Sequence, residues 1–366
     1  MSKCKSLIWV ALFLIVLVSP PFTFFFLGPY VDGANYENRS IESKPVFSLS
    51  NYESFSQEYE KYYNDHIPFR NQLIQFSSKL DFFLFRQSSN DNVDIGKEGW
   101  LFYCNDEDHN PVEQSLGYWH FTQEELRTIA ENLVVTKESL NKKGIEFVLF
   151  IAPNKETIYG DYLPDYYQVR NNYTSTDQMV DYLRENTDIR VVYPKEELLE
   201  MRRKNPDIVL YHKLDTHWNF AGGYIGANSL AKELGIGMPL LSEVTIEQQF
   251  ASSGDLTNML NISIENGDID YNITNISALN TENEKWDFLT EFIYHTPGAD
   301  QRKLFVCRDS FATSLAPALA TQFEESLWVH GSIFEQQRVL DYNTNIFVYE
   351  TVERYENSLL NFRILY

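Results

Sequence analysis

From residue 122 onward, the apolar positions of the chain switch repeatedly between a helical period and short continuous runs. One helical face of leucine and isoleucine residues ends at Gly144, and residues 145–151 then form a nearly uninterrupted apolar run. Such a run is typical of a strand that is buried on both faces of a parallel sheet. Further short apolar runs occur at residues 190–193, 208–211, 303–307, 327–330 and 346–349. The alternation predicts an α/β fold in which helices cover a mostly parallel sheet.

The N-terminus carries a longer apolar run. Residues 7–27 contain no charge, and at about 1.5 Å per residue they span roughly 30 Å, the hydrocarbon thickness of a bilayer. Lys3 and Lys5 precede the run and Asp32 follows it, so the positive-inside rule places residues 1–6 in the cytoplasm and the bulk of the chain outside the cell membrane. A cleaved signal peptide is the alternative, but the run lacks a small-x-small cleavage site. We therefore predict an uncleaved single-pass transmembrane anchor over residues 7–27.

Between the anchor and the α/β pattern, the sequence predicts a stem followed by helices. Residues 28–50 contain Gly, Pro, Asn and Ser with little periodicity. Two stripes of aromatic and leucine residues at helical spacing follow, and we interpret them as core or docking surfaces. We place the stem and its helices at residues 28–100 and the α/β domain at 101–366. Residues 239–300, rich in Asn, Glu and Ser, are expected to form an irregular insertion in that domain.

Composition narrows the class of protein. The 366 residues are 43% hydrophobic and carry a formal net charge of -22. Such a chain can bury a sizeable core, but it offers no basic surface for nucleic acid or for an anionic lipid patch. Three cysteines do not make a disulfide framework. Cys4 precedes the predicted anchor, and we interpret Cys104 and Cys307 as buried thiols, with a disulfide between them as the alternative.

The strongest candidate chemistry is the pair Asp215 and His217. In an extended backbone, residues i and i+2 share a face, so Asp215 can accept a hydrogen bond from one ring nitrogen of His217 and leave the other facing a reactant. One alternative is a metal site of His212, Asp215 and His217, although a second carboxylate or a cysteine cluster is missing. The other is a histidine that merely precedes a helix capped by Asn219.

Ser310 is the candidate nucleophile. Residues 304–307 predict a buried strand, Arg308, Asp309 and Ser310 form a polar turn, and apolar residues at four-residue spacing predict a helix after it. A serine at this turn would lie at the carboxyl edge of the sheet near helix amides, which suits a nucleophile whose tetrahedral intermediate needs hydrogen-bond donors. The alternative is that Asp309 or Ser310 only caps the helix. Together with His217 and Asp215, Ser310 would complete a Ser-His-Asp device.

These motifs resemble the DHHW family and the SGNH-like alginate O-acetyltransferases of the AlgJ and AlgX type. The resemblance rests on Asp-x-His-Trp at residues 215–218, Asp-Ser-Phe at 309–311, the N-terminal anchor, and a Lys-x-Gly-Trp-Leu-Phe turn at 97–102. It spans most of the chain after the anchor. It implies an SGNH-hydrolase-like three-layer sandwich in which the Asp and His precede the Ser, as they do here.

The resemblance also implies roles for individual residues. Ser310 would be the nucleophile, His217 the base and then the acid, and Asp215 the residue that orients the imidazole. Asn154 and Lys155 belong to a segment that is similar to one placed near the site, where they are candidates for substrate binding. Gly254, in a loop that resembles a family loop, is a candidate oxyanion donor.

Two residues depart from the family pattern. Thr216 stands where the pattern has a second His, and we expect it to matter little because it points away from the imidazole face. Arg308 replaces the Gly that often precedes Asp-Ser. We expect Arg308 to stabilise an oxyanion, to bind a sugar carboxylate, or to narrow the site by its bulk.

What the resemblance implies for function is a membrane-anchored, extracytoplasmic O-acetyltransferase that acts on an exopolysaccharide or cell-wall glycan. Ser310 would take an acetyl group from a membrane donor protein of the MBOAT type and pass it from an acetyl-enzyme to a sugar hydroxyl activated by His217. We expect neither a cofactor nor a metal. Two alternatives stay open: a carbohydrate acetylesterase with the same triad, and a non-catalytic glycan-binding or scaffold subunit of an acetylation complex.

Overall fold

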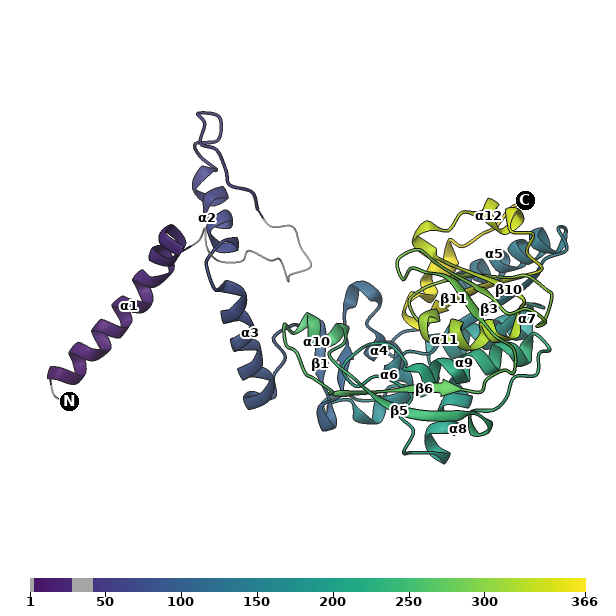
Figure 1. Cartoon of the computed structure of the whole chain (residues 1–366). Coiled ribbons are helices and arrows are strands. Elements are labelled where there is room, and N and C mark those ends of the chain that lie inside the picture. The colour runs from purple at the N-terminus through teal and green to yellow at the C-terminus, as the bar shows by residue number, and fades with distance from the viewer. Residues whose placement is uncertain (1–2, 28–41) are drawn as a thin grey trace. The chain divides into compact units, whose positions relative to one another are not determined.

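The computed structural model describes residues 3–27 and 42–366, and the chain divides into two compact units, Met1–Ser89 and Asn90–Tyr366 (Figure 1). Residues 1–2 of the predicted cytoplasmic tail and residues 28–41 of the predicted stem lie outside the described residues. We expected the boundary at residue 100, whereas the division falls earlier in the chain, after Ser89. The physical reason is that strand β1 (Val93–Ile95) pairs with β2 (Leu101–Tyr103), and the Leu101 amide donates a hydrogen bond to the Lys213 carbonyl 3.0 Å away, which ties both strands to the second unit.

The first unit is helical. It contains α1 (Lys3–Leu27), α2 (Phe55–Asp65), α3 (Arg70–Leu80) and the short π-helix η2 (Asp81–Phe85). In the described part of the chain, one helical segment, Leu7–Phe26, is long and apolar enough to cross a membrane, a test that a signal sequence near the N-terminus also meets. The helices α2 and α3 coincide with the two stripes predicted from the sequence.

The second unit is built on a mixed, mostly parallel sheet. Within the described residues, seven strands follow the order β4-β3-β11-β9-β10-β8-β7. The strands from β4 to β10 in that order run parallel, whereas β8 and β7 are antiparallel at one edge. The strands are β3 (Glu146–Ala152), β4 (Arg190–Val192), β7 (Glu282–Trp286), β8 (Glu291–His295), β9 (Leu304–Arg308), β10 (Glu325–His330) and β11 (Ile346–Val352). The predicted α/β class is therefore confirmed.

Helices cover both faces of this sheet, because its strands alternate apolar residues toward two cores. Phe147, Leu149 and Ile151 of β3 pack with one set of helices, and the intervening Val148 and Phe150 pack with the other. The first set contains α5 (Gln123–Asn141), α7 (Ser175–Asn186) and α12 (Gln336–Asp341), and the second contains α4 (Pro111–Ser115), α6 (Lys155–Tyr159), α8 (Lys195–Lys204), α9 (Phe220–Glu233) and α11 (Ala312–Leu319). The result is the three-layer α/β sandwich that the family resemblance implied.

Two sequence predictions differ from the structure. Residues 208–211 were expected to be a strand, but only Tyr211 pairs, in an isolated bridge with Trp218. The amides of Val209 and Leu210 instead donate hydrogen bonds to the hydroxyls of Tyr271 and Tyr159, at 3.0 and 2.9 Å, so this apolar run is a buried loop.

Residues 239–300 are more regular than the irregular insertion that we expected. They contain the paired strands β5 (Thr245–Ala251) and β6 (Asp268–Thr274), the short helix α10 (Asp255–Met259), and both antiparallel strands of the main sheet. Their composition gives little apolar signal because β7 is exposed along its whole length and β5 along most of it. Single-turn helices complete the unit: η3 (Lys97–Gly99), η4 (Asp106–Asp108), η5 (Gly160–Tyr162), η6 (Leu241–Glu243), η7 (Ala320–Gln322), η8 (Gly331–Ile333) and the longer η9 (Glu353–Leu360).

The helices α9 and α11 approach each other closely through a glycine. A Cβ atom at Gly223 would lie 2.5 Å from the carbonyl oxygen of Ser314 on α11, which is a clash with backbone. Because His217 lies three residues before α9 and Ser310 two residues before α11, this contact also affects how near those two residues come.

We expect Gly223→Ala to lower the free energy of unfolding by about 1–3 kcal/mol, because overpacking the contact outweighs the better helix propensity of alanine. Urea denaturation of both proteins measures the difference. Gly237→Ala is the matched control, since a Cβ there would meet nothing within 4 Å. An unchanged unfolding free energy in the Gly223 variant would show that the helices can separate without cost.

Candidate active site

Asp215 and His217 lie in the loop that leads into α9. The Asn219 side chain caps this helix by accepting hydrogen bonds from the amides of Ala221 and Gly222, at 3.1 and 3.2 Å. His217 stays outside the helix, and its ring Nδ1 lies 2.6 Å from Asp215 Oδ1. The same oxygen accepts a hydrogen bond from the His217 backbone amide at 2.9 Å. The predicted i, i+2 contact is therefore present, and so is the predicted Asn219 cap.

Ser310 lies in the turn between β9 and α11, and its Oγ is 2.6 Å from His217 Nε2. The neighbouring Asp309 holds this turn, because its carboxylate accepts hydrogen bonds from the amides of Phe311 at 2.8 Å and Val352 at 2.7 Å. Its own amide donates to Glu350 on β11 at 2.8 Å. The N-cap residue of α11 is Phe311 and no side chain caps this helix, so the capping alternative for Asp309 or Ser310 is wrong. Asp309 instead closes the turn before the helix, and the Ser310 hydroxyl faces the imidazole.

The three side chains form one continuous hydrogen-bond chain that is partly open to solvent. About a quarter of the His217 side chain is exposed, and 21% of that of Asp215. Burial alone would raise the pKa of the Asp215 carboxyl, but hydrogen bonds from the His217 ring and from the backbone amides of Asp255 and His217 hold this pKa well below its usual range. Asp215 is therefore a carboxylate. With Nδ1–H donated to it, Nε2 can accept the proton of the Ser310 hydroxyl.

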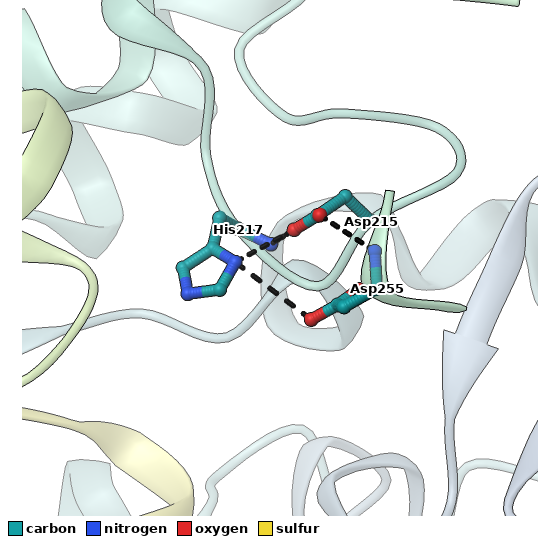
Figure 2. A group of neighbouring side chains, drawn as sticks. All are labelled: Asp215, His217 and Asp255. Carbon is teal, nitrogen blue, oxygen red and sulfur yellow. Dashed lines mark hydrogen bonds and ion pairs between the residues drawn. The ribbon is translucent and has the colours of Figure 1, made fainter. Parts of the chain in front are cut away.

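A second carboxylate, Asp255, completes the group, and Figure 2 shows it on the same side of the His217 ring as Asp215. Asp255 Oδ2 is 3.8 Å from His217 Nδ1, and the Asp255 amide donates to Asp215 Oδ2 at 2.8 Å. The resemblance of the loop around Gly254 to a family loop was the signal in the sequence, but it assigned no role to Asp255, which begins the short helix α10. The imidazole therefore faces two negative charges.

Gly254 and Thr216 both help to position the carboxylates of Asp215 and Asp255. A Cβ at Gly254 would lie 2.3 Å from the Asp215 Cβ, so only glycine lets α10 approach so closely. We expected the Gly254 amide to donate a hydrogen bond to an oxyanion, whereas its role in the structure is steric. Thr216 donates from its amide to Asp255 at 2.8 Å and also from its hydroxyl. The expectation that Thr216 matters little is corrected, because its side chain folds toward Asp255 and fixes it.

Asp215, His217 and Asp255 form the one group in the described chain whose ligand atoms lie close enough, within 4.8 Å of one another, to hold a metal ion. His212, the third ligand of the metal alternative, instead faces Asp268, with 3.6 Å between Nδ1 and Oδ1. The Asp215 and Asp255 oxygens already accept hydrogen bonds from Thr216, His217 and backbone amides. An ion bound at His217 Nδ1 would have to displace the hydrogen bond to Asp215 that orients the imidazole.

Lys155 lies beneath the loop that holds the pair. Its side chain is completely buried, and its ammonium donates to the carbonyl oxygens of Asp215 at 2.6 Å and His212 at 3.3 Å. Burial lowers the pKa of Lys155, and the negative charges of Glu156 and Asp255 partly offset this effect. The lysine that was expected to bind substrate thus fixes the backbone of the loop and is shielded from solvent.

Asn154 is equally buried and belongs to a polar network below the site. Its side chain donates to Gln114 at 3.1 Å and accepts from Arg354 at 3.2 Å. Gln114 in turn donates to Glu356 at 2.9 Å. Asn154, also expected to contact substrate, is therefore engaged by protein groups on both ends of its amide.

The same network contains Glu356, whose carboxyl pKa is strongly raised. Burial, with a contribution from the charge of Glu353, raises the pKa of Glu356 from its ordinary 4.5 to about 8. Between these two values the folded protein retains a proton that the unfolded chain releases, so folding stability decreases as pH rises from about 4.5 to about 8.

We expect Glu356→Gln to remove this pH dependence and to be more stable than wild type at pH 8 by roughly 2–5 kcal/mol. Urea denaturation of both proteins at pH 5 and pH 8 measures these differences in the free energy of unfolding. Glu124→Gln, on the exposed side of α5, is the control and should follow the wild-type profile. Parallel profiles for wild type and Glu356→Gln would contradict the assignment of a buried neutral carboxyl.

Arg308 is 1% exposed and is directed toward the turn between β7 and β8. Its guanidinium donates to the Phe288 carbonyl at 2.8 Å and lies 4.0 Å from the centre of the Phe292 ring. Among the described residues, no hydrogen bond joins the guanidinium to Ser310, His217 or Asp215. The expected oxyanion or carboxylate contact of Arg308 is thus replaced by a contact with a neighbouring turn.

Cys104 and Cys307 are both free thiols in the structure, and Cys307 is buried. Cys307 thus fits the interpretation of two buried thiols, whereas Cys104 is only partly buried.

Comparisons with known proteins agree with the fold. Residues 93–287 match the family model of the SGNH hydrolase-like domain of the acetyltransferase AlgX, which is just over half of the chain. The match includes Asp215, His217 and Asp255 and ends before Ser310. The probable alginate O-acetylase AlgJ of Pseudomonas putida is 24% identical over 206 residues, which cover 55% of this chain and 50% of that protein. The chain thus matches about half the length of these curated relatives.

Solved structures of two proteins resemble this chain at low sequence identity. Bacillus cereus PatB1 superposes with a TM-score of 0.54 and 16% identity over 75% of this chain and 100% of that protein. A second structure of PatB1 carries a sulfonyl adduct. A DHHW family protein from Eubacterium siraeum has a TM-score of 0.49 and 13% identity, over 65% of this chain and 89% of its own.

Proposed function

Because this chain belongs to the family of SGNH hydrolase-like domains described for the acetyltransferase AlgX, we propose that it is an O-acetyltransferase that modifies a glycan. Ser310, His217 and Asp215 are the proposed catalytic residues. The observation that carries the proposal is the imidazole of His217 at 2.6 Å from both the Ser310 hydroxyl and the Asp215 carboxylate. No other arrangement in the site offers a nucleophile, a base and an orienting carboxylate in one chain of contacts.

In the first half of the proposed reaction, Ser310 Oγ attacks the carbonyl carbon of an acetyl donor while its proton moves to His217 Nε2. The tetrahedral intermediate then expels the donor's leaving group, which takes that proton, and an acetyl ester on Ser310 remains. In the second half, a sugar hydroxyl gives its proton to Nε2 and attacks the ester, and the proton returns to Ser310. Asp215 stabilises the imidazolium in both halves, and Asp255 adds to this at longer range.

We propose that the backbone amide of Ser310 donates to the developing oxyanion, because the next amide, that of Phe311, already donates to Asp309. The contacts of Gly254 with Asp215 and of Arg308 with Phe288 favour this assignment over the donors first considered. Amides at the start of a helix carry partial positive charge and cost no reorganisation when the oxyanion forms.

We further propose that α1 anchors the protein in the cell membrane, with the second unit on the extracytoplasmic side. The apolar span Leu7–Phe26 supports the anchor, and the preceding lysines support the orientation. A membrane donor protein of the MBOAT type would then supply acetyl groups at the same surface. The name alginate O-acetylase given to the AlgJ relatives supports a polysaccharide as the acceptor.

The test is acetyl transfer by the full chain in detergent, with 4-nitrophenyl acetate as donor and an oligosaccharide as acceptor. Ester-linked acetyl on the oligosaccharide, found by mass spectrometry, is the expected result. If all acetate is released to water, whether or not the oligosaccharide is present, the protein is an esterase and not a transferase. Absence of any turnover would favour the non-catalytic subunit. A chelator should leave the rate unchanged if the carboxylates act on the imidazole and not on a metal.

A further inference from the structure

The turn between β7 and β8 lies at the same edge of the sheet as Ser310. Because β8 runs antiparallel to its neighbour, its first residues are level with the last residues of β9 and β10. Glu291 pairs with Val329, and the His330 amide donates to the Thr290 carbonyl at 2.7 Å. His330 in turn pairs with Arg308, two residues before Ser310. The carboxyl edge of the parallel strands, where α/β sites lie, thus includes this turn.

Three apolar side chains around this turn are exposed. Trp286 is 44% exposed, Phe288 46% and Leu289 72%. Exposed aromatic side chains that lie together on a protein surface commonly mark a binding site.

Trp286 is held rigidly. Its ring stacks on that of Phe292, with 4.0 Å between the ring centres and an angle of 10° between the planes. Phe292 is fully buried, and the Arg308 guanidinium lies 4.0 Å from its centre. Arg308 also fixes the turn itself by donating to the Phe288 carbonyl at 2.8 Å. A ring fixed before binding loses little conformational entropy when a ligand covers it.

The distance to the nucleophile suits an extended ligand. In the sheet, β7 is three strands from β9, which is roughly 14 Å at about 4.8 Å per strand. The turn also lies at this edge, since the side chain of Arg308, two residues before Ser310, donates to its Phe288 carbonyl. A short oligosaccharide could therefore lie over the aromatic rings and reach Ser310 with a hydroxyl.

We propose that Trp286 and Phe288 form an acceptor platform, on which one sugar ring of the glycan stacks while a hydroxyl of a neighbouring sugar is acetylated. The inference rests on the proposed function and specifies its acceptor site. Pyranose rings have an apolar C–H face and polar edges, so an aromatic ring can bury the face and leave the hydroxyls in water. Such stacking requires no cation, which suits a chain with a net charge of -22.

The size of the platform favours a glycan over a protein partner. Two aromatic rings bury at most roughly 250 Å² each, whereas a stable protein interface needs about 800 Å² from each partner.

The test measures glycan binding without turnover, in the full chain that carries Ser310→Ala. The probes are a β-1,4-linked N-acetylglucosamine hexasaccharide and a mannuronate hexasaccharide, titrated calorimetrically. Adding Trp286→Ala should weaken the binding of the probe that the parent binds by about tenfold, with a smaller loss for Phe288→Ala. Trp286→Phe should retain most of the affinity because a ring remains. Phe250→Ala, which removes a ring 66% exposed on β5, is the matched control and should bind as the parent does.

Unchanged affinity in the Trp286→Ala and Phe288→Ala variants would overturn the proposal, and so would equal losses in the Phe250→Ala control. Failure of the parent to bind either oligosaccharide would also overturn it. Since no turnover is needed, these outcomes are separate from failure of acetyl transfer. Circular dichroism checks that each variant is folded, which the exposure of the replaced rings leads us to expect.

Discussion

Replacing Ser310 by alanine should lower the rate of acetyl ester turnover by at least about 10³-fold. The acetyl-enzyme cannot form without the Ser310 oxygen, which lies 2.6 Å from the His217 base. The initial rate with 4-nitrophenyl acetate measures the loss. An aryl sulfonyl fluoride, which reacts with a serine hydroxyl activated by a neighbouring base, should label Ser310 in the wild type and nothing in the variant, as peptide mass spectrometry can establish.

Ser332 provides a matched control for this experiment. Its hydroxyl also lies 2.7 Å from a histidine ring nitrogen, that of His330, yet within the described residues no carboxylate hydrogen-bonds that ring. Ser332→Ala should therefore keep wild-type activity and labelling. Equal rates for wild type and Ser310→Ala, with the label on another residue, would remove Ser310 from the mechanism.

Replacing Asp215 by asparagine should reduce turnover on the order of 10³–10⁴-fold while the fold persists. The amide has nearly the shape of the carboxylate but cannot stabilise the imidazolium, and its NH₂ group would favour the tautomer with the proton on Nε2. His217 could then no longer accept the Ser310 proton. The expected loss is in kcat, measured by steady-state kinetics at pH 7.5, because the carboxylate acts in the transition state and does not bind substrate.

Asparagine variants of two further aspartates serve as comparisons for Asp215→Asn. Asp255→Asn should cause a much smaller loss, since its carboxylate is 3.8 Å from Nδ1, whereas that of Asp215 is 2.6 Å away and hydrogen-bonded. Asp165→Asn should have no effect, because the side chain of this residue is 90% exposed and forms a surface ion pair with Lys97. If Asp255→Asn were as damaging as Asp215→Asn, both carboxylates would belong to one functional unit, and a metal held by the pair would have to be tested directly.

Contacts between residues close in sequence were predictable from the residues themselves. Asp215 and His217 meet because they are two residues apart in a bent segment, where the carboxylate reaches both the amide and the ring of His217. Asn219 caps the next helix because its side chain reaches the nearby amides. The buried strands β3, β9, β10 and β11 were predictable because residues buried on both faces of a sheet leave continuous apolar runs. The strands β5 and β7 were missed because their side chains are largely exposed.

Residue type alone misled us about the charged side chains near the site. Lys155 and Arg308 were expected to face substrate, since basic groups bind oxyanions and carboxylates. Both are buried, and each donates hydrogen bonds to backbone carbonyl oxygens. Lys155 donates to the carbonyl of Asp215, and Arg308 donates to that of Phe288. Whether a basic residue faces solvent or protein depends on the packing around it, which no local pattern records.

The amino-acid sequence by itself determined the α/β class, the apolar N-terminal segment and the orientation of His217 by Asp215, because each depends on short-range periodicity or on neighbouring residues. Only the tertiary structure decided that Ser310 reaches that imidazole, that Asp255 and Thr216 support it, and that exposed aromatic rings stand at the same edge of the sheet. These contacts join segments 40 to almost 100 residues apart. They exist because the glycine at position 223 lets two helices pack closely and because parallel and antiparallel strands bring their ends to one edge.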